Sequence, residues 1–412
     1  MKIGYLIQEG VPSIHKRPLT GQAHHVICVI RELKRAGHQV HLLAKIERRV
    51  WLSEDLENFQ PVVVTRMDQG PLRWLEKAVR RLQSQFGLAY ANYFESLRFA
   101  HACQQVLSDC DIYYERMSWL GYGGGLAAQW QKIPLVLEVN GDHLDEFASQ
   151  GLQIRKSQQD LSYFLMKKAA SRVSHVVATG EGWRQKYIER WGIAPSKASV
   201  VENGSQLVDL LQREDLRSFR PIQPNEPLRI VYCGGFEAWH GVPILVRAVQ
   251  IAAQKNCQLH VTLIGSGSES AKVAGMIKDL GLETNFTLIG QMNIEEMAQF
   301  VATADIGISP YCGRVEYSGL KLLDYKAAGL ATIASGKDGQ PSVIQHQLTG
   351  WVVPPCDEIA LAQAIITLAE NHALRVKMGQ EARNEAEAIH SWRHTAEQLL
   401  NIFRSLQYNA KS

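Results

Sequence analysis

Glu316-Tyr-Ser-Gly-Leu-Lys-Leu-Leu-Asp-Tyr-Lys-Ala-Ala-Gly329 is followed directly by an apolar run, Leu330-Ala-Thr-Ile-Ala334. A Ser-Gly turn, an apolar helix and a strand in this order predict one half of a nucleotide-binding α/β unit. Free backbone N–H groups at the helix start attract phosphate, and Lys321 in the first turn adds a positive charge. The carboxylates of Glu316 and Asp324 suit the hydroxyl groups of a sugar and a ribose. A solvated helix face is the alternative for these two acids.

Composition limits the class of protein. The chain has 412 residues, of which 46% are hydrophobic and 21% are charged, enough for two domains with their own cores. A net charge of +3 is no signature of nucleic-acid binding. The N-terminus does not resemble a signal peptide, and no apolar run reaches the ~18 residues of a membrane span. Seven cysteines without a C-x-x-C pair are typical of small core residues, which favours a reducing, cytoplasmic setting.

Strands and helices alternate along the first half of the chain. Strands are predicted at 2–7, 40–43, 61–65, 111–115, 134–139, 175–179 and 198–202. Polar residues end two of them, at Glu115-Arg116 and at Glu138 to His143, and open α/β sheets bind ligands at such strand ends. His24 and His25 start the first helix, where capping or surface roles compete with a role in a cleft.

A basic amphipathic helix is predicted between Leu72 and Phe86. Its apolar residues recur at steps of three and four, and four basic residues lie elsewhere on it, at Arg73, Lys77, Arg80 and Arg81. We interpret it as a helix packed on the sheet with a solvated basic face. A membrane-surface patch is the alternative.

The second half repeats a strand, a glycine turn and a helix. Glycines follow the predicted strands at Gly234-Gly235, Gly265 and Gly290, after a polar segment with three prolines between 213 and 227. Each such turn alone is common to many nucleotide folds. Their order and spacing together predict a second nucleotide-binding α/β domain.

The same residues resemble a known family. Glu316, Gly319, Asp324, Ala327 and Gly329 are similar to the E-x7-E signature of the family 4 retaining glycosyltransferases, with Asp324 replacing the second Glu. The segment 318–325 is similar to the S-P-L-K-L-F-E-Y form of polysaccharide-type members, in which the spelling of 137–141, Leu-Glu-Val-Asn-Gly, also occurs.

The resemblance implies an α/β protein with the GT-B fold: two doubly wound Rossmann-like domains facing a cleft, and a C-terminal helix returning to the first domain. The implied parts are an acceptor-side domain at 1–212, a linker at 213–227, a nucleotide-sugar-binding domain at 228–385 and the C-terminal helix at 386–412.

The implied activity is that of a retaining hexosyltransferase in polysaccharide or glycoconjugate synthesis. It moves a sugar from a nucleotide sugar to an acceptor hydroxyl, without a metal or another cofactor. The acceptor is a sugar or a lipid-linked sugar, with peripheral contact to the cytoplasmic membrane face and no nucleic acid. Asp109-Cys-Asp111 spells a metal motif, but it precedes a strand and is attributed to chance.

The resemblance also implies a set of site residues. The catalytic residues are Glu316, Asn140 and His143, with Asn140 at the position where the family often has histidine. The donor-binding residues are Gly21, Gly234, Gly235, His240, Gly265, Gly290, Arg314, Ser318, Gly319, Leu320, Lys321 and Asp324.

Two alternatives stay open. A nucleotide-sugar epimerase shares the architecture, although the acids that its chemistry needs are not located. A non-catalytic GT-B-like binding subunit is the second alternative, because Gly235 and His240 stand where the family usually has Arg and Lys.

Overall fold

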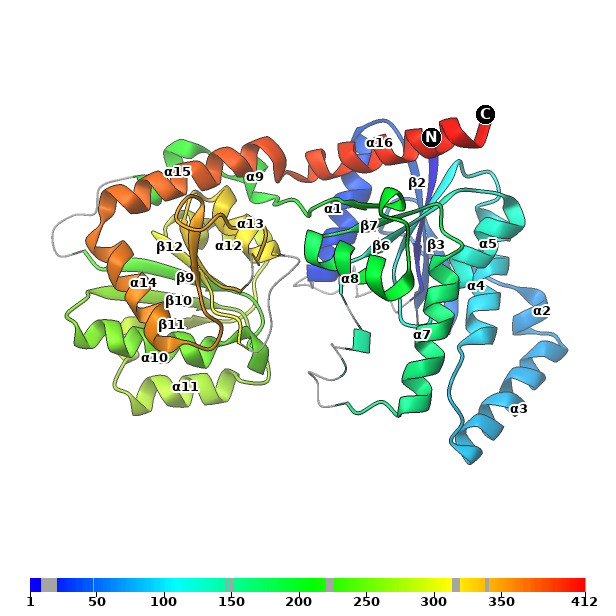
Figure 1. The fold of residues 1–412 in the computed structure, drawn as a ribbon, viewed down its shortest axis with the longest axis horizontal. Coiled ribbons are helices and arrows are strands. Elements are labelled where there is room, and N and C mark those ends of the chain that lie inside the picture. Colours follow the sequence, from blue (N-terminus) through cyan, green and yellow to red (C-terminus); the bar gives the residue numbers. More distant parts are fainter. Residues whose placement is uncertain are drawn as a thin grey trace. The chain divides into compact units, whose positions relative to one another are not determined.

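The computed structural model describes residues 1–8, 21–46, 48–141, 143–144, 147, 152–219, 226–312, 319–337 and 341–411. The chain forms two compact units (Figure 1). The first unit holds Met1–Val201 and Ala396–Ser412, and the second holds Glu202–Thr395. Each unit is an α/β structure built around its own sheet.

Among the described residues, eight strands form the first sheet. Their order across the sheet is β4 (Gln60–Val62), β3 (Arg49–Ser53), β2 (Gln39–Ile46), β1 (Lys2–Ile7), β5 (Ile112–Arg116), β6 (Leu135–Val139), β7 (His175–Ala178) and β8 (Ala198–Val200). Neighbours from β2 to β8 pair in parallel, whereas β3 and β4 add an antiparallel edge. Because the chain leaves β1 for β2 on one side and later reaches β5 on the other, the strand order reverses between β1 and β5.

Helices connect the strands of the first unit. They are α1 (Gly21–Arg35), α2 (Thr65–Asp68), α3 (Pro71–Phe86), α4 (Tyr93–Val106), α5 (Gly123–Gln131), α7 (Lys156–Ala170), α8 (Glu181–Trp191) and the short η1 (Pro195–Lys197). The central strands β1 and β6 are apolar along most of their length and are buried, as parallel strands covered on both faces must be.

Six parallel strands form the second sheet within the described part of the chain. Their order is β11 (Phe286–Ile289), β10 (Leu259–Ile264), β9 (Leu228–Cys233), β12 (Ile306–Ser309), β13 (Ala331–Ser335) and β14 (Gly350–Val353). The chain runs outward from β9 to β11, returns to the other side of β9 and continues to β14. The strand order therefore reverses between β9 and β12, where open α/β sheets bind ligands.

Helices lie on both faces of the second sheet (Figure 1). Alternate residues of β9 enter two different cores: Ile230 packs with residues of α10 and α14, whereas Val231 packs with residues of α12 and α13. The helices of this unit are α9 (Leu207–Leu210), η2 (Arg213–Asp215), η3 (Arg217–Phe219), η4 (Ala238–His240), α10 (Val242–Gln254), α11 (Ser270–Asp279), η5 (Glu283–Asn285), α12 (Ile294–Ala302), α13 (Leu320–Ala327), α14 (Glu358–Glu370), α15 (His372–Ile389) and the start of α16 (Trp392–Lys411).

The units divide the chain earlier than the segment expected to be a linker. The change falls between Val201 and Glu202. Leu207, Leu211 and Leu216 then join the core that contains α13, so the segment from 202 to 219 belongs by its packing to the second unit. The last helix, α16, begins in the second unit and ends in the first.

Three secondary-structure expectations need correction. The strand predicted at 61–65 is the short, largely exposed edge strand β4 (Gln60–Val62), and α2 already begins at Thr65. Pro61 suits such an edge, where one side of the strand has no partner. The neighbouring β3 was not predicted. The helix at 72–86 exists as α3, but its apolar side chains do not lie on the sheet, as described below.

The cysteines also differ from expectation. Cys28, Cys103, Cys110 and Cys233 are buried thiols, as predicted. Cys312 and Cys356 form a disulfide, although they are 44 residues apart and no sequence motif links them. The prediction that the cysteines are small core residues in a reducing setting is therefore wrong for these two. No helix in the described ranges is both long enough and apolar enough to cross a membrane.

Candidate active site

Two glycine turns meet at the carboxyl ends of β9 and β10. Gly265 has φ +131°, and a Cβ there would lie 1.9 Å from the carbonyl oxygen of Gly234. Gly234 has φ +149°, and its N–H donates to the carbonyl of Ile264 at 2.9 Å. Only glycine fits this pair of positions, because a side chain at Gly265 would collide with backbone. The two turns therefore pack backbone against backbone, with no room for a side chain between them.

Lys321 reaches the same point from the first turn of α13. A Cβ on Gly234 would lie 2.9 Å from its Nζ. The ammonium lies 4.7 Å from the ring centre of Tyr232 and 4.6 Å from that of Tyr311, and it donates to the Tyr232 hydroxyl at 3.4 Å. Tyr232 belongs to β9, and Tyr311 follows β12. The lysine is thus held by aromatic rings at the point where the strand order reverses.

His240 lies beside the second glycine of the β9 turn. A Cβ on Gly235 would be 2.9 Å from its Cε1. The ring packs edge-on against Tyr311, with 5.0 Å between centroids, and its Nδ1 accepts from the N–H of Glu237 at 3.3 Å. The prediction that His240 lies with the glycine turn therefore agrees with the geometry. The imidazole is positioned by the η4 turn before α10 begins.

The N-terminus of α13 is the helix start that the sequence pointed to. Gly319 caps it with φ +57°, and Leu320 is its first residue. Three residues predicted for this site, Arg314, Glu316 and Ser318, lie outside the described residues. The structure thus places the helix and Lys321, while the acid that begins the E-x7-E pattern stays a prediction.

Asp324, the second acid of the pattern, faces an unexpected partner. Its Oδ1 accepts a hydrogen bond from the Ser205 hydroxyl at 2.6 Å. Burial raises the pKa of Asp324 to about 7, and the hydrogen bond from Ser205 only partly opposes this rise. Ser205 is itself buried and donates its N–H to the carbonyl of His390 at 2.8 Å. The carboxyl group is therefore fixed in position and close to half ionised at neutral pH.

The third predicted strand-end glycine behaves differently. Gly290 has no heavy atom within 4 Å of an added Cβ, so nothing in its surroundings requires glycine. It follows β11, which pairs with β10 next to the turn at Gly265. Gly21, predicted for the same ligand, belongs to the first unit and is the exposed first residue of α1.

In the first unit, Asn140 joins a buried network around Glu138. Its Nδ2 donates to Glu138 Oε1 at 2.9 Å, and the guanidinium of Arg116 donates to the same oxygen at 2.8 Å. The other oxygen accepts from the Tyr114 hydroxyl and lies 2.9 Å from His25 Nε2. Burial alone would raise the pKa of Glu138, but His25 and Arg116 lower it to about 2. Glu138 is therefore ionised at neutral pH, with Arg116 as its counter-charge.

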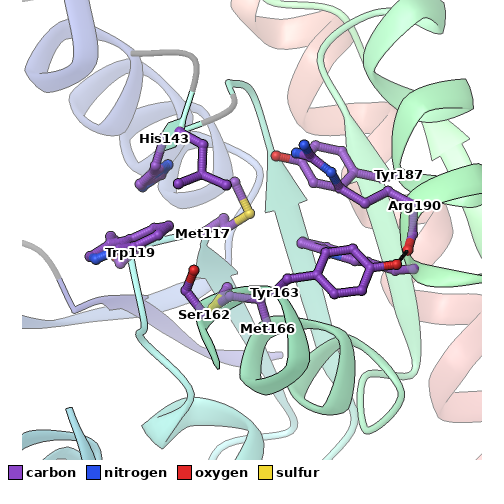
Figure 2. A pocket seen from close by; sticks show the side chains of 11 residues that line it. Met117, Trp119, His143, Ser162, Tyr163, Met166, Tyr187 and Arg190 are labelled. Carbon is purple, nitrogen blue, oxygen red and sulfur yellow. Dashed lines mark hydrogen bonds between the residues drawn. The ribbon is translucent and has the colours of Figure 1, made fainter. Parts of the chain in front are cut away.

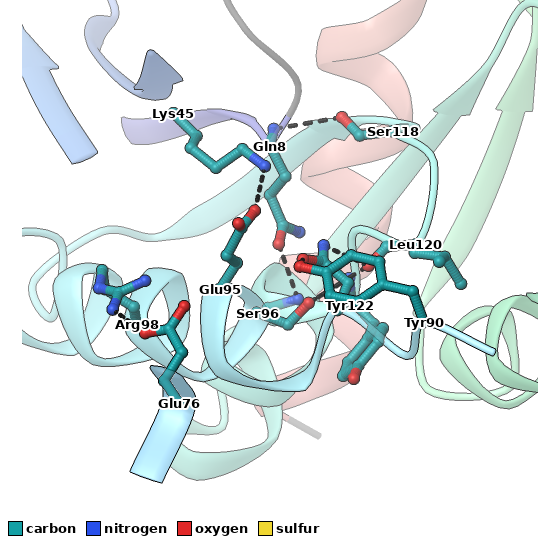
Figure 3. A network of polar contacts seen from close by, with 12 residues as sticks. Gln8, Lys45, Glu76, Tyr90, Glu95, Ser96, Arg98, Ser118, Leu120 and Tyr122 are labelled. Atoms are coloured by element: carbon teal, nitrogen blue, oxygen red, sulfur yellow. Dashed lines mark hydrogen bonds and ion pairs between the residues drawn. The ribbon is translucent and has the colours of Figure 1, made fainter. Parts of the chain in front are cut away.

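A second buried carboxyl lies on the neighbouring strand, and its pKa is shifted in the opposite direction. Glu115 of β5 accepts from the amide of Gln8, whose Oε1 accepts from the N–H of Gly123 at 3.0 Å. Gln8 also donates its backbone N–H to the Ser118 hydroxyl at 3.2 Å (Figure 3). Burial raises the pKa of Glu115 to about 8, so this group is mostly neutral at pH 7. The network fixes the end of β1 at the point where the strand order reverses.

His143 lies in a separate, aromatic-lined pocket of the first unit (Figure 2). Its ring stacks on Trp119, with 6.3 Å between centroids and 21° between planes. The pocket opens to solvent, and its empty volume, open part included, is about 390 Å³. It is lined by residues that follow β5 and β6 and by residues of α7 and α8: Met117, Ser118, Trp119, His143, Leu144, Ser162, Tyr163, Met166, Tyr187, Arg190 and Trp191. Asn140 and His143, predicted to act together, thus have different surroundings.

The sequence reasoning missed several partners of the predicted residues. Tyr232 and Tyr311 hold Lys321, Ser205 holds Asp324, and Glu138 holds Asn140. An aromatic residue one or two positions from a strand end was a usable signal for the two tyrosines. Ser205 is 119 residues from Asp324, and no local pattern connects them. Among the described residues, no group of three His, Cys, Asp or Glu side chains is arranged to hold a metal ion.

Comparison with known proteins assigns this architecture to a class. The structure is similar over 98% of the chain to sucrose-phosphate synthase from Thermosynechococcus elongatus, of which 98% is covered, with a TM-score of 0.70 and 19% identity. It is similar to the same extent, 98% of this chain and 100% of the other, to HepE from Anabaena solved with UDP, with a TM-score of 0.70 and 18% identity. The fold is GT-B.

Sequence comparison then identifies the family. Residues 19–207 match the model of Glycosyltransferase Family 4, and residues 213–385 match that of Glycosyl transferases group 1. Because the two matches together cover most of the chain, the protein belongs to the family 4 glycosyltransferases of the GT-B type.

Two named relatives match at low sequence identity. The amylovoran biosynthesis glycosyltransferase AmsK of Erwinia amylovora is 28% identical over 44% of this chain, and the match spans only 46% of AmsK. The D-inositol 3-phosphate glycosyltransferase of a Nocardioides species is 24% identical over 95% of this chain and 88% of its own length.

Proposed function

We propose that the protein is a retaining glycosyltransferase that moves a sugar, of hexosyl type, from a nucleotide sugar to an acceptor hydroxyl in polysaccharide or glycoconjugate synthesis. The observation that carries this proposal is the convergence of Lys321, Gly234 and Gly235 at the reversal point of the second sheet. A helix N-terminus, a lysine and a glycine turn together provide the positive potential and the space that a diphosphate needs. The Anabaena protein of the same fold was solved with UDP-glucose, which supports a nucleotide-sugar donor here.

The donor side would be formed by the second unit. Lys321 and the N–H groups at the start of α13 would neutralise the diphosphate as its charge develops in the transition state. Asp324 would accept from the ribose, and Glu316 from the hydroxyls of the donor sugar. His240 would add a hydrogen-bond donor beside Gly235, because an imidazole whose Nδ1 accepts from Glu237 carries its proton on Nε2.

The acceptor side would be formed by the first unit, with Asn140 and His143 near the reacting carbon. Retention follows from attack on the face that the leaving diphosphate occupies, with that diphosphate taking the acceptor's proton, so no carboxylate nucleophile is assigned. The acceptor would be a sugar or a lipid-linked sugar at a cytoplasmic membrane face. Similarity to AmsK over 186 residues supports the polysaccharide assignment.

We further propose that no metal ion is needed. Lys321 and the α13 N-terminus already supply positive charge to the diphosphate, which is the role of a divalent cation in metal-dependent transferases. Full turnover in excess EDTA is the expected result. Activity that disappears with EDTA and returns with Mn²⁺ or Mg²⁺ contradicts this part of the proposal.

The decisive test is incubation with a panel of nucleotide sugars, starting with UDP-linked hexoses. Slow donor hydrolysis, or transfer to added glycans, with the α-configuration of the donor kept in the product by NMR, is expected. Glu316→Ala should lower turnover by more than about tenfold and leave thermal unfolding unchanged, since a carboxylate contributes about 1.5–3 kcal/mol per hydrogen bond.

Two other outcomes would replace the proposal. A donor sugar converted to its epimer without an acceptor would identify an epimerase. Tight nucleotide-sugar binding with neither hydrolysis nor transfer would favour a non-catalytic binding subunit, which the Gly235 and His240 positions suggest.

A further inference from the structure

Helix α3 carries an apolar stripe that faces solvent. Leu75, Leu82 and Phe86 recur at steps of seven and four and therefore share one helix face. They are 51%, 50% and 67% exposed. The preceding Trp74 is 72% exposed, and Leu88, just beyond the helix, is also exposed. Contiguous exposed apolar groups of this kind mark an interaction surface.

The stripe is exposed because α3 is attached through its polar face. Glu76, the single carboxylate of the helix, is buried and accepts from Arg98 of α4 at 2.6 Å. Arg80 donates to Glu95 of α4 at 2.5 Å, and Lys45 of β2 donates to the same carboxylate at 2.6 Å (Figure 3). In Figure 1, α3 lies at the periphery of the first unit, beyond α4. The ion pairs thus hold the polar face inward and turn the apolar face outward.

A basic stripe lies on the opposite flank of the same outward face, with Trp74 between the two stripes. Arg73, Lys77 and Arg81 follow each other at steps of four and are exposed. In the described part of the chain none of the three forms an ion pair. Lys77 instead lies 5.1 Å from the Trp74 ring. Glu76 of the helix and Glu95 of α4 are already paired on the inner side. The outer surface of α3 is therefore apolar and cationic.

We propose that this surface of α3, its apolar stripe (Leu75, Leu82, Phe86) with its basic stripe (Arg73, Lys77, Arg81), docks the protein on an anionic lipid surface. Apolar side chains would enter the headgroup boundary, Trp74 would lie at the interface, and the basic stripe would meet anionic headgroups. A second copy of the chain fits less well, since a symmetric contact pairs the surface with itself and places like charges together. The proposal concerns where the protein acts and does not rest on its donor or acceptor.

The test is co-sedimentation of the full chain with two kinds of vesicle. One contains phosphatidylcholine alone, and the other contains in addition about 30–40% phosphatidylglycerol, which makes its surface strongly anionic. Binding to anionic vesicles at low salt, and weaker binding in about 0.5 M salt, is expected. The triple variant Arg73→Glu, Lys77→Glu, Arg81→Glu should lower the partition coefficient more than about tenfold, because each basic residue near the surface contributes several-fold. Leu75→Ser with Phe86→Ser should lower it at both salt concentrations.

The matched control reverses three exposed lysines of the second unit, Lys255, Lys278 and Lys377, to Glu, which changes the net charge by the same amount. It should bind vesicles like the wild type. Donor hydrolysis and nucleotide binding should be unchanged in all three variants, which separates a failure of docking from a failure of the proposed function.

Two results overturn the proposal. One is a wild-type protein that stays in the supernatant with anionic vesicles at low salt. The other is a stable dimer, by analytical ultracentrifugation, that the Leu75→Ser, Phe86→Ser variant converts to monomer, because a second copy would then cover the apolar stripe.

Discussion

The carboxyl ends of the two sheets differ in the groups that surround their charged side chains. At the reversal point of the second sheet, the described groups include glycine backbone, two tyrosine rings, the His240 imidazole and one cation, Lys321. At the corresponding end of the first sheet, side chains fill the space, and Glu138 alone is surrounded by four of them. One end is built from backbone and carries a cation, whereas the other is filled by side chains around a carboxylate that Arg116 neutralises.

This difference explains why the site at the second sheet could be predicted from the sequence. Glycine turns and a lysine in the first turn of a helix are local features, and each has a characteristic position after a strand or before a helix. The Glu138 network joins residues as far apart as His25 and Glu138, which are separated by 113 positions. The following predictions test whether the end of the second sheet depends on close backbone packing and the end of the first sheet on charge pairing.

The largest effect is expected at Gly265. Gly265→Ala should lower stability by about 3 kcal/mol or more and abolish nucleotide binding, because the new Cβ collides with the Gly234 carbonyl and φ is positive. Urea unfolding and titration calorimetry measure the two effects. Gly290→Ala is the matched control at the next strand end, where an added Cβ meets nothing, and it should unfold like the wild type. Equal stability of both variants would contradict the close packing of the turns.

Glu138→Gln tests the end of the first sheet and should cost about 3 kcal/mol at pH 7, since it leaves Arg116 buried without its counter-charge. The pKa of Glu138 is about 2 in the folded chain and 4.5 ordinarily. Its stabilising contribution is therefore complete above pH 4.5 and is lost as pH falls from there toward 2. Wild-type stability should fall over this window more steeply than that of the variant. Glu181→Gln, which breaks an exposed pair with Arg184, should cost less than about 0.5 kcal/mol.

Lys321→Ala should weaken nucleoside diphosphate binding by at least about tenfold, because a charge-assisted hydrogen bond contributes about 1.5–3 kcal/mol. Lys321→Arg should restore binding only in part, since a planar guanidinium does not reproduce a compact ammonium between Tyr232 and Tyr311. Lys272→Ala on α11 is the exposed control. Unchanged affinity in Lys321→Ala would show that the phosphates bind elsewhere.

The smallest effect concerns Asp324. Its pKa of about 7 means that the carboxyl gains a proton as pH falls from 8 to 6, and a protonated group accepts ribose hydroxyls poorly. Nucleoside diphosphate affinity of the wild type should therefore fall several-fold more over this range than that of Asp324→Asn. The difference between the two pH profiles reports the titration of the Asp324 carboxyl alone, since the diphosphate itself titrates identically in both experiments. Parallel pH profiles would remove Asp324 from the ribose site.

The sequence by itself determined the repeated strand, glycine turn and helix of the second unit, the GT-B class, and the cluster of Gly234, Gly235, His240 and Lys321. These features follow from backbone conformation and from hydrogen bonds between near neighbours, so the residue order contains them. The strand ends of the first unit were also predicted as polar, but not which of their groups would be charged.

Only the tertiary structure decided the rest. Glu138 is ionised and Glu115 mostly neutral, although both are buried acids at neighbouring strand ends, because His25 and Arg116 reach one carboxyl and an amide reaches the other. The amphipathic pattern of α3 predicted an apolar and a polar face but not which of them faces the protein. Ion pairs with Arg98 and Glu95 of α4 hold the polar face inward, whereas the apolar face was expected there. Such choices depend on the energy of burying a charge with or without a partner, and the partner is brought by distant parts of the chain.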